Sequence, residues 1–280
     1  MFNEVATRLL ERIAQELSAP DLVFPTSFDL TIRVQALLKD PNVSIEKLAE
    51  SIRTEPLMSS KIIAYANSAA LRGVGGEIMD LQPAILRIGL DAVSTVSYSL
   101  AVEQIIRSKH MMPFHDLSNA IWEHSLTVAS IAKLLARRVK LNPEKAFFLG
   151  MVHDLGAFYL IFRCAEDPAL AADRPQLLEL VFEWHDGIGH ALLSAMGQPE
   201  DVVTAVQDHE ATVTIDNLNG WTALLACADQ LSQPISDWVP AELRGRRPRT
   251  LAESLFSETE LAEIETLARE NLAALRAVLF

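Results

Sequence analysis

An adjacent histidine and aspartate, His153 and Asp154, stand out because they interrupt a long apolar stretch. Residues 146–162 read AFFLGMVHDLGAFYLIF, and this pair supplies the only readily ionised groups among them. A helix that is apolar on every side is normally buried in the protein. Burying a carboxylate costs on the order of several kcal/mol unless the group is paired or binds a metal ion. The pair therefore indicates either a structural salt bridge or two metal ligands.

Four further His and Asp side chains occupy inward positions on the apolar stripes of predicted helices. They are His124, His185, His209 and Asp229. His124, for example, lies on one stripe with Ile121 and Val128. Taken singly, a histidine on an apolar face is typical of a hydrogen-bonded core residue. Taken together, the pattern predicts that five elements each direct a His or Asp side chain inward.

Mixed imidazole and carboxylate ligands suit a transition metal, and a cation among them would remove the cost of burying each group alone. We therefore expect one or two divalent ions (Fe, Mn, Mg, Zn or Ni) held by His124, His153, Asp154, His185, His209 and Asp229. His190 and Glu210 are additional candidates, and His110 and His115 are expected in solvent. The alternative without metal is a polar network in the core in which every member is satisfied.

The composition is that of a folded globular chain. Its 280 residues are 50% hydrophobic and 22% charged, with a mean hydropathy of +0.18, which excludes a disordered protein. The net charge of −13 argues against direct binding of nucleic acid, because phosphate neutralisation needs clustered positive charge. The arginines at positions 244–249 are interpreted as a solvated loop.

The positions of charged residues and of the two cysteines indicate the cellular compartment of the protein. The longest uncharged stretches fall short of the ~18 apolar residues of a membrane span, so no membrane contact is expected. Charged residues within the first twenty exclude a secretory signal. Cys164 and Cys227 are far apart in apolar stretches and are interpreted as reduced packing residues. We therefore expect a cytoplasmic protein.

Residue usage is helical throughout, and no convincing run alternates with the period of a strand, which predicts an all-α protein. Proline, glycine and capping residues set the limits of the predicted helices. These are residues 1–18, 27–39, 45–53, 57–67, 83–88, 91–108, 117–139, 143–165, 175–185, 188–196, 199–209, 218–231 and 258–278. The predicted divisions are an N-terminal helix at 1–21, a first helical part at 22–110, a helical bundle at 111–240 and a helical extension at 241–280.

The order His124, His153-Asp154, Asp229 resembles the H…HD…D signature of the HD superfamily of metal-dependent phosphohydrolases. A longer resemblance, over about residues 22–235, is to the HDOD family of bacterial signal-output modules related to HD domains. It is carried by Pro25, Asp40-Pro41, Val43-Ser44, Leu48-Ala49, Pro56-Leu57, Ala66-Asn67-Ser68, Ile85 through Gly89, His124-Ser125, Met151–Gly156, His185 with Gly189, Leu192-Leu193, Gly197 with Pro199, and Ala228-Asp229.

The resemblance implies an all-α fold with an N-terminal helical layer packed on an HD-like bundle, and it implies a regulatory role. His185 and His209 also match the additional histidines of the related HD-GYP cyclic-di-GMP phosphodiesterases. The sequence departs from those enzymes at three places. Ala157 stands where they carry the lysine of HDxGK, Glu210 replaces the second histidine of their His-His pair, and the GYP triplet is missing.

Two functional hypotheses follow. In the first, the chain is a regulatory signal-transduction module that acts on an unidentified signalling protein or a small ligand such as a nucleotide, with a homodimer left open. In the second, it is a metal-dependent phosphohydrolase or phosphodiesterase that acts on a nucleotide or cyclic dinucleotide, with Asp154 as its catalytic residue. The HDOD blocks and Ala157 favour the first hypothesis.

Overall fold

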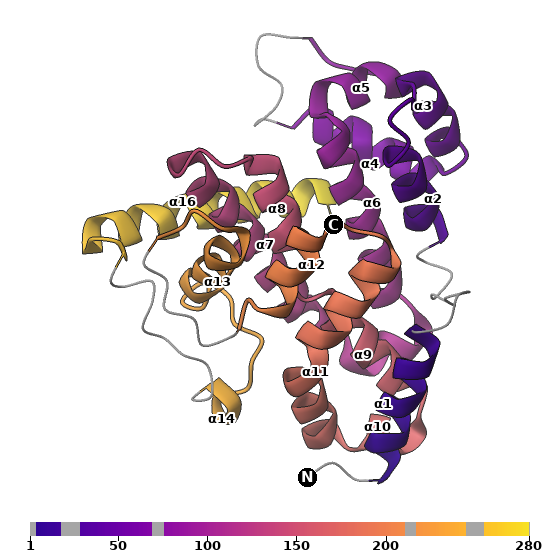
Figure 1. Ribbon diagram of the computed structural model, residues 1–280, viewed down its shortest axis with the longest axis vertical. Coiled ribbons are helices and arrows are strands. Elements are labelled where there is room, and N and C mark those ends of the chain that lie inside the picture. Colours follow the sequence, from indigo (N-terminus) through magenta and orange to yellow (C-terminus); the bar gives the residue numbers. More distant parts are fainter. Residues whose placement is uncertain (1–3, 18–28, 69–75, 211–216, 245–254, 280) are drawn as a thin grey trace. The chain divides into compact units, whose positions relative to one another are not determined.

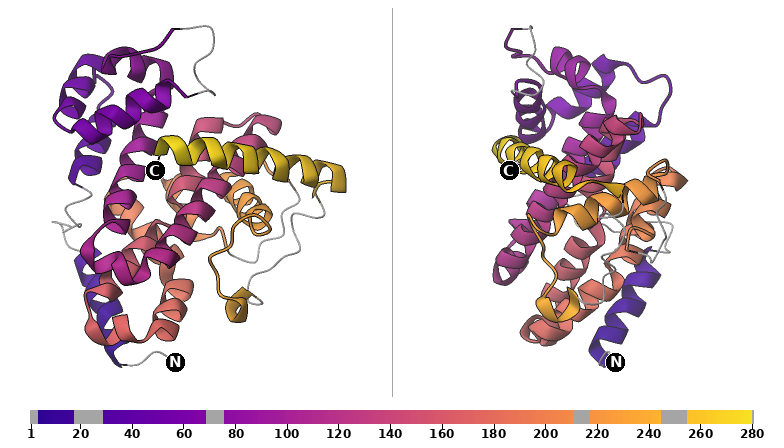
Figure 2. Two further views of the ribbon diagram at one scale, coloured as in Figure 1. Left: turned by 180° about the vertical axis from the view of Figure 1, so that it is seen from behind. Right: turned by 90° about the vertical axis from the view of Figure 1, so that its left-hand side faces the viewer.

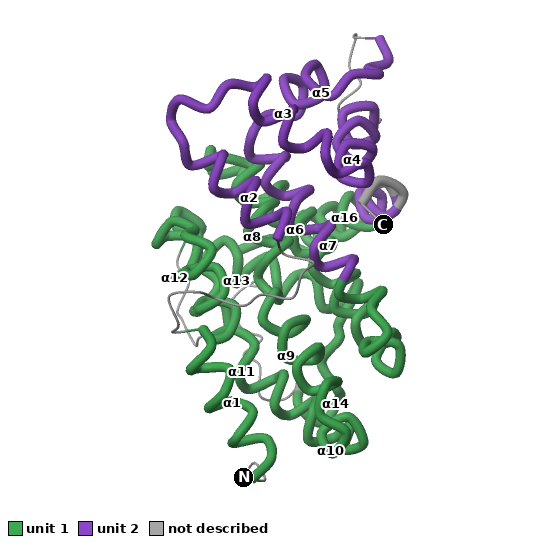
Figure 3. Tube along the Cα trace, turned by 90° about the vertical axis from the view of Figure 1, so that its right-hand side faces the viewer, with its two compact units in different colours: residues 1–23, 105–269 green, residues 24–104, 270–280 purple. Residues whose placement is uncertain are grey.

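Every regular element in the described part of the chain is a helix, so the predicted all-α fold class is confirmed (Figure 1). The computed structural model describes residues 4–17, 29–68, 76–210, 217–244 and 255–279. The chain forms two compact units that are interleaved in sequence (Figure 3): residues 1–23 and 105–269 form unit 1, and residues 24–104 and 270–280 form unit 2. The divisions expected at residues 21, 110 and 240 stay predictions, because these units describe packing rather than independent folding.

Unit 2 is built from α2 (Asp29–Leu38), α3 (Ile45–Arg53), α4 (Pro56–Ala66), α5 (Leu81–Ile88), most of α6 (Leu90–Ile106) and residues 270–279 of α16 (Glu258–Leu279). Ser44 caps α3 by accepting a hydrogen bond from the backbone N–H of Lys47, and Pro56 begins α4. Gly89, with a φ of 81°, ends α5. The limits predicted from capping residues and proline are therefore close to those observed in this unit.

Unit 1 contains the longest helix that lies wholly inside one unit, α7 (His115–Arg138). Its other elements are α1 (Glu4–Leu17), the 3-10 helix η2 (Lys109–Phe114), α8 (Pro143–Val152), α9 (Leu155–Ala165), α10 (Pro168–Ala172), α11 (Arg174–Ala195), α12 (Glu200–Gln207), α13 (Trp221–Ser232), α14 (Ala241–Arg244) and residues 258–269 of α16 (Glu258–Leu279). Within this unit α7 packs along α8 and α13, and α9 packs along α11 (Figure 2).

Two predicted helix limits are wrong. The helix expected over residues 143–165 is two helices, α8 and α9, which meet at His153 and Asp154. Asp154 has φ −95° and ψ 17°, outside the helical region, so the helix is interrupted there. The two helices expected over 175–185 and 188–196 are one continuous helix, α11. Gly187 lies on its exposed side and costs the helix only about 1 kcal/mol, which packing offsets.

The stretch from Pro143 to Ala165 is long and apolar enough to cross a membrane by length and composition alone. However, 89% of its most apolar window is buried inside the protein, as expected for core helices. Among the described residues, the only other segment that meets this criterion is α5 with α6, if the pair is counted as one span, and the two are bent by 108°.

Candidate metal centre

Five elements of unit 1 bring the predicted ligands into one buried region. His124 lies on α7, His153 and Asp154 at the junction of α8 and α9, His185 on α11, His209 in the turn after α12, and Asp229 on α13. None of these six residues is more than 3% exposed. The inward positions predicted from the apolar stripes are therefore the positions that the structure shows.

Two glycines allow the junction of α8 and α9 to approach its neighbours closely. A Cβ atom at Gly150 would lie 2.4 Å from the backbone of Ala129 on α7, and one at Gly156 would lie 1.9 Å from the carbonyl oxygen of His185 on α11. Any larger residue would push one of these helix pairs apart. The glycines thus place the junction against the ligand-bearing parts of both α7 and α11.

Three of the histidines direct their Nδ1 atoms at a backbone carbonyl three or four residues earlier in the chain. These contacts are His153 with Gly150 at 2.8 Å, His185 with Val181 and Phe182 at 3.1 Å each, and His209 with Val206 at 2.6 Å. A carbonyl oxygen only accepts, so each Nδ1 carries the hydrogen and each Nε2 keeps the lone pair that binds a metal. Metal-ligating histidines are typically oriented in this way.

His124 reaches the same orientation through a partner that is distant in sequence. Its Nδ1 atom donates to the carbonyl oxygen of Ser236 at 3.1 Å, and the Oγ atom of Ser232 lies 3.2 Å away. On the other side of the ring, Nε2 lies 2.9 Å from Oδ1 of Asp229. An imidazole nitrogen and a carboxylate oxygen at this distance repel each other unless a proton or a metal cation accompanies them.

The ligand atoms form three overlapping groups, in each of which all atoms lie within 4.8 Å of one another. The groups are His124, His153 and Asp229; His153, Asp154 and His209; and His185, His209 and Glu210. His153 belongs to the first two groups and His209 to the last two. Because neighbouring groups share a ligand, the arrangement fits more than one ion.

The carboxylate of Asp154, a member of the second group, also lies near histidines of the first and third groups. Its Oδ2 atom is 3.4 Å from Nε2 of His153 and 3.7 Å from Nε2 of His124, and its Oδ1 atom is 3.4 Å from Nε2 of His185. The indole Nε1–H of Trp238 donates a hydrogen bond of 2.8 Å to Oδ2. Each oxygen of this carboxylate thus faces different histidines.

The protonation states suit a metal site. Burial lowers the pKa of His153 to about 4. Burial alone would raise the pKa of Asp154, but the surrounding histidines, His153 foremost, outweigh it and lower that pKa to about 2. At neutral pH, therefore, His153 is neutral and Asp154 is ionised, which are the forms that a metal ion binds.

Buried polar atoms without a hydrogen-bond partner test whether the residues fit a divalent cation. The Nε2 atoms of His153 and His209 and the Oδ1 atom of Asp154 are buried and have no such partner. Leaving these atoms unsatisfied would cost on the order of 1–3 kcal/mol each. A cation would satisfy all three, so the donor set fits a divalent metal better than a closed polar network.

Of the two additional candidates, Glu210 joins a ligand group and His190 does not. Glu210 belongs to the third group, and its Oε1 atom lies 3.7 Å from Nε2 of His185. His190 is in none of the three groups. His110 and His115 are exposed, as expected. The assignment of metal to these groups stays a prediction.

Sequence reasoning missed two contributors to the site, Trp238 and the carbonyl of Ser236. Both lie between α13 and α14, outside any helix, where no apolar periodicity indicates which side chains point inward. The only signal at Trp238 is a large aromatic residue in a stretch with two prolines, Pro234 and Pro240, which is also typical of an ordinary loop.

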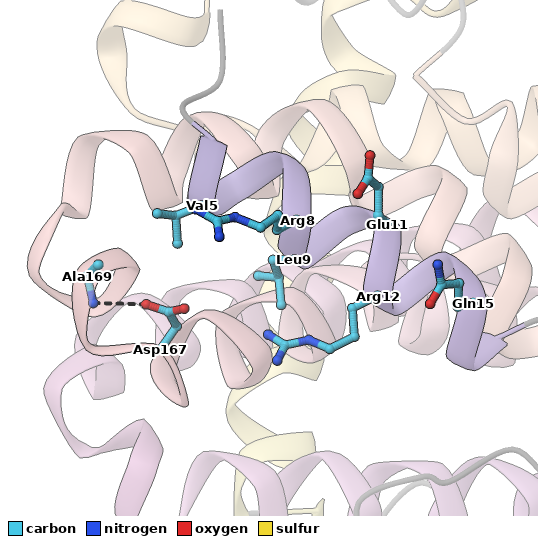
Figure 4. A pocket seen from close by; sticks show the side chains of 8 residues that line it. All are labelled: Val5, Arg8, Leu9, Glu11, Arg12, Gln15, Asp167 and Ala169. Atoms are coloured by element: carbon cyan, nitrogen blue, oxygen red, sulfur yellow. Dashed lines mark hydrogen bonds between the residues drawn. The ribbon is translucent and has the colours of Figure 1, made fainter.

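A surface depression of about 550 Å³ lies elsewhere in unit 1, between α1 and the region around α10 (Figure 4). Residues of both charges line it: Arg8, Glu11, Arg12 and Asp167, with Val5, Leu9, Gln15 and Ala169. Asp167 is engaged in capping α10, where its Oδ1 atom accepts hydrogen bonds from the backbone N–H groups of Ala169 and Leu170. The depression contains none of the predicted ligands.

A family model described as the HDOD domain matches residues 24–212. Among curated proteins, Ribonuclease Y of Thermus thermophilus is 26% identical over 263 residues, which cover 91% of this chain and 36% of that protein. Ribonuclease Y of Fervidobacterium nodosum is 25% identical over 214 residues, covering 76% and 34%, respectively. The chain therefore spans about a third of the length of these curated relatives.

Solved structures share the fold. A Shewanella amazonensis protein, provisionally named a metal-dependent phosphohydrolase, has a TM-score of 0.69 at 22% identity and covers 98% of this chain and 99% of its own. An HDOD domain protein of unknown function from Geobacter sulfurreducens has a TM-score of 0.64 at 24% identity, with the same coverage. A Marinobacter aquaeolei protein, provisionally named a signal transduction protein, has a TM-score of 0.60 at 15% identity, covering 98% of this chain and 66% of its own.

Proposed function

Because the chain belongs to the HDOD domain family, we propose that it is a regulatory signal-transduction module whose functional form depends on a buried divalent-metal centre. The observation that carries this proposal is the convergence of four histidines and two aspartates from five elements of unit 1. A module that acts through surface contacts alone has no need to bury so many ligand atoms, each of which is costly without a cation.

The closed geometry of the site supports a regulatory rather than an openly catalytic centre. The ligand side chains of the HD superfamily pattern, His124, His153, Asp154 and Asp229, are at most 4% exposed. Structural metal sites are closed, whereas catalytic sites keep a position open to substrate. The buried Ala157, at the position of the HDxGK lysine, provides no charge to hold a phosphate.

The ligand groups indicate how two ions would be held. His124, His153 and Asp229 would bind one ion, and His185, His209 and Glu210 the other, with Asp154 between them. Imidazole and carboxylate together suit Fe, Mn, Zn or Ni better than Mg, which prefers oxygen ligands alone.

Metal content tests the centre. We expect protein purified without a chelator and without an affinity tag to carry one or two ions per chain by mass spectrometry. His153→Gln should lose most of this metal, because His153 belongs to two ligand groups. His190→Gln on α11 is the matched control and should retain it, because His190 lies outside all three groups. Wild-type protein that stays metal-free after incubation with Fe²⁺, Mn²⁺ or Zn²⁺ would refute the proposal.

The regulatory role has a separate test. Metal-loaded and chelator-treated protein would be compared for retention of nucleotides and of proteins from a bacterial lysate, alongside hydrolysis assays. We expect retention of a ligand or partner by the metal-loaded form and no hydrolysis. Equal retention by both forms would contradict a metal-dependent output.

Phosphohydrolysis is the second candidate, and the completeness of the ligand set favours it. A divalent ion supplies a more acidic coordinated water and neutralises charge on phosphoryl oxygens. Among the chain's own residues, Asp154 is suited to orient an attacking water, because its Oδ1 atom accepts no hydrogen bond. The curated relatives named Ribonuclease Y suggest a phosphodiester substrate. The net charge of −13 favours a nucleotide or cyclic dinucleotide over a long nucleic acid.

Hydrolysis of nucleotides and cyclic dinucleotides with added Mn²⁺, Fe²⁺ or Mg²⁺ decides between the candidates. Activity that falls by at least ~10²-fold in Asp154→Asn, the loss typical for removal of a general base, would favour the enzyme. The absence of turnover with all three metals, by protein shown to bind metal, would leave the regulatory module.

A further inference from the structure

His124 differs from the other three histidines of the centre in how its ring is oriented. The carbonyls that fix His153, His185 and His209 lie three or four residues away. The carbonyl that fixes His124 belongs to Ser236, 112 residues away. The tautomer and direction of His124 are therefore set by Oγ of Ser232 on α13 together with a non-helical segment, residues 233–239 between α13 and α14, which we call the clasp segment.

The clasp segment has three further contacts with the region of the centre. The indole Nε1–H of Trp238 donates to Oδ2 of Asp154 at 2.8 Å, and the hydroxyl of Ser236 donates to Oγ1 of Thr127 at 2.9 Å, one turn along α7 from His124. The ring of Trp238 packs edge-on against that of His185, with centroids 5.6 Å apart and an interplanar angle of 88°. Trp238 itself is only 5% exposed.

These contacts orient two of the predicted ligands, His124 and Asp154. Oδ2, which Trp238 holds, is the oxygen of Asp154 that faces His124 and His153. With Oδ2 held on that side, Oδ1 remains directed at His185. The indole therefore determines which oxygen of the shared carboxylate faces which histidines, while the carbonyl of Ser236 leaves Nε2 of His124 available for a cation.

We propose that docking of the clasp segment and binding of metal are thermodynamically coupled, with Trp238 as the positioning residue. This inference rests on the metal centre proposed above. When the segment is docked, His124 and Asp154 are preorganised and metal binds tightly. When it is undocked, Asp154 loses the indole hydrogen bond, Nδ1 of His124 keeps only Oγ of Ser232, and affinity falls. By linkage, bound metal must stabilise the docked segment by the same free energy.

The first test measures metal affinity by competition with a chromogenic chelator, using Zn²⁺ or Mn²⁺. Trp238→Phe keeps an aromatic ring against His185 but removes the indole N–H. We expect roughly 10- to 100-fold weaker binding, the usual cost of removing a partner that orients a metal ligand. Trp221→Phe at the start of α13 is the matched control and should bind as the wild type does, because Trp221 lies outside the ligand groups.

The second test follows the wild-type chain and uses Trp238→Phe only to assign one signal. The four tryptophans should give four indole N–H signals in the NMR spectrum of ¹⁵N-labelled protein, and the signal missing from Trp238→Phe is that of Trp238. We expect hydrogen exchange of this indole N–H to slow at least tenfold when diamagnetic Zn²⁺ is added, while exchange at Trp184, which is 42% exposed, stays unchanged.

The outcomes separate this inference from the proposed function. If the wild type binds no metal, both are overturned. If the wild type binds metal but Trp238→Phe binds it equally well, or the indole exchange of Trp238 is unaffected by Zn²⁺, the metal centre stands and the coupling is overturned. Weaker binding in Trp238→Phe together with slowed exchange in the wild type supports the coupling.

Discussion

Gly156 is a residue at which a single added methyl group would reach the backbone of another helix. Its Cβ position lies 1.9 Å from the carbonyl oxygen of His185, an atom held within α11. We expect Gly156→Ala to lower the free energy of unfolding by about 1–3 kcal/mol through overpacking, and to lower metal affinity because α9 and α11 separate. Chemical denaturation and chelator competition measure the two effects.

Gly187 provides the control for that prediction. It lies on α11, and a Cβ there would meet nothing within 4 Å. Gly187→Ala should therefore raise stability by about 0.5–1 kcal/mol, since alanine favours the helix. If both variants were destabilised equally, helix propensity and close approach would not explain the two positions.

At the scale of elements, α1 is held to α9 by an ion pair that titrates. Nη2 of Arg163 donates to Oε1 of Glu16 at 3.1 Å, and Nη1 donates to the other carboxylate oxygen. This hydrogen bond lowers the pKa of Glu16 below its ordinary value of 4.5 despite partial burial. A depressed carboxyl pKa stabilises the fold above the unfolded-state pKa, and this stabilisation is lost as the pH falls through the folded-state pKa.

Glu16→Gln should therefore be less stable than the wild type at pH 7, by about 1 kcal/mol at most because the carboxylate is one-third exposed. The difference should shrink below pH 4.5 as Glu16 becomes protonated in the wild type. Urea unfolding at several pH values measures this trend. Glu11→Gln, an exposed position on the same helix, should show no such dependence. A difference that persists at low pH would mean that packing rather than charge is responsible.

A second element-scale prediction concerns α4 and α6 in unit 2. Nζ of Lys61 lies 2.8 Å from Oε2 of Glu103, and the two side chains are only 10% and 6% exposed. Removing either partner takes the opposite charge at 2.8 Å away from a buried ion, so Lys61→Met and Glu103→Leu should each destabilise the fold, by up to about 3–5 kcal/mol. The double variant should recover most of that loss in thermal denaturation. Additive losses would show that the pair does not act as a unit.

The helices also show what a sequence can reveal about this site. Apolar periodicity placed His124, His185, His209 and Asp229 inward, because a helix repeats its buried face every three to four residues. The same reasoning predicted one helix over residues 143–165, because nothing in an evenly apolar stretch indicates where the helix is interrupted. Apolar periodicity could not identify Trp238, because the clasp segment has no repeating pattern. Its partner Asp154 is also 84 residues away in the sequence.

At the scale of the whole molecule, the two units should respond differently to metal. All six predicted ligands belong to unit 1, whereas α2, α3, α4 and α5 belong to unit 2. A ligand that binds only the folded state adds about 2.7 kcal/mol at one hundred times its Kd. Hydrogen exchange read by mass spectrometry should therefore show increased protection in α7, α9, α11 and α13. Equal increases in α2–α5 would mean that the effect of metal is not confined to unit 1.

The contact between His124 and Ser236 constrains evolution in an unusual way. Every amino acid provides a backbone carbonyl, so residue 236 can vary without losing the acceptor that His124 requires. Alignments will consequently show no preferred residue there on account of this bond. The chain length between Ser232 and Trp238 is what must be kept, since an insertion would shift the carbonyl and the indole out of register with their two partners. Relatives that bind metal in the same manner should keep the tryptophan and the length of this segment, while residue 236 is free to vary as far as this carbonyl is concerned.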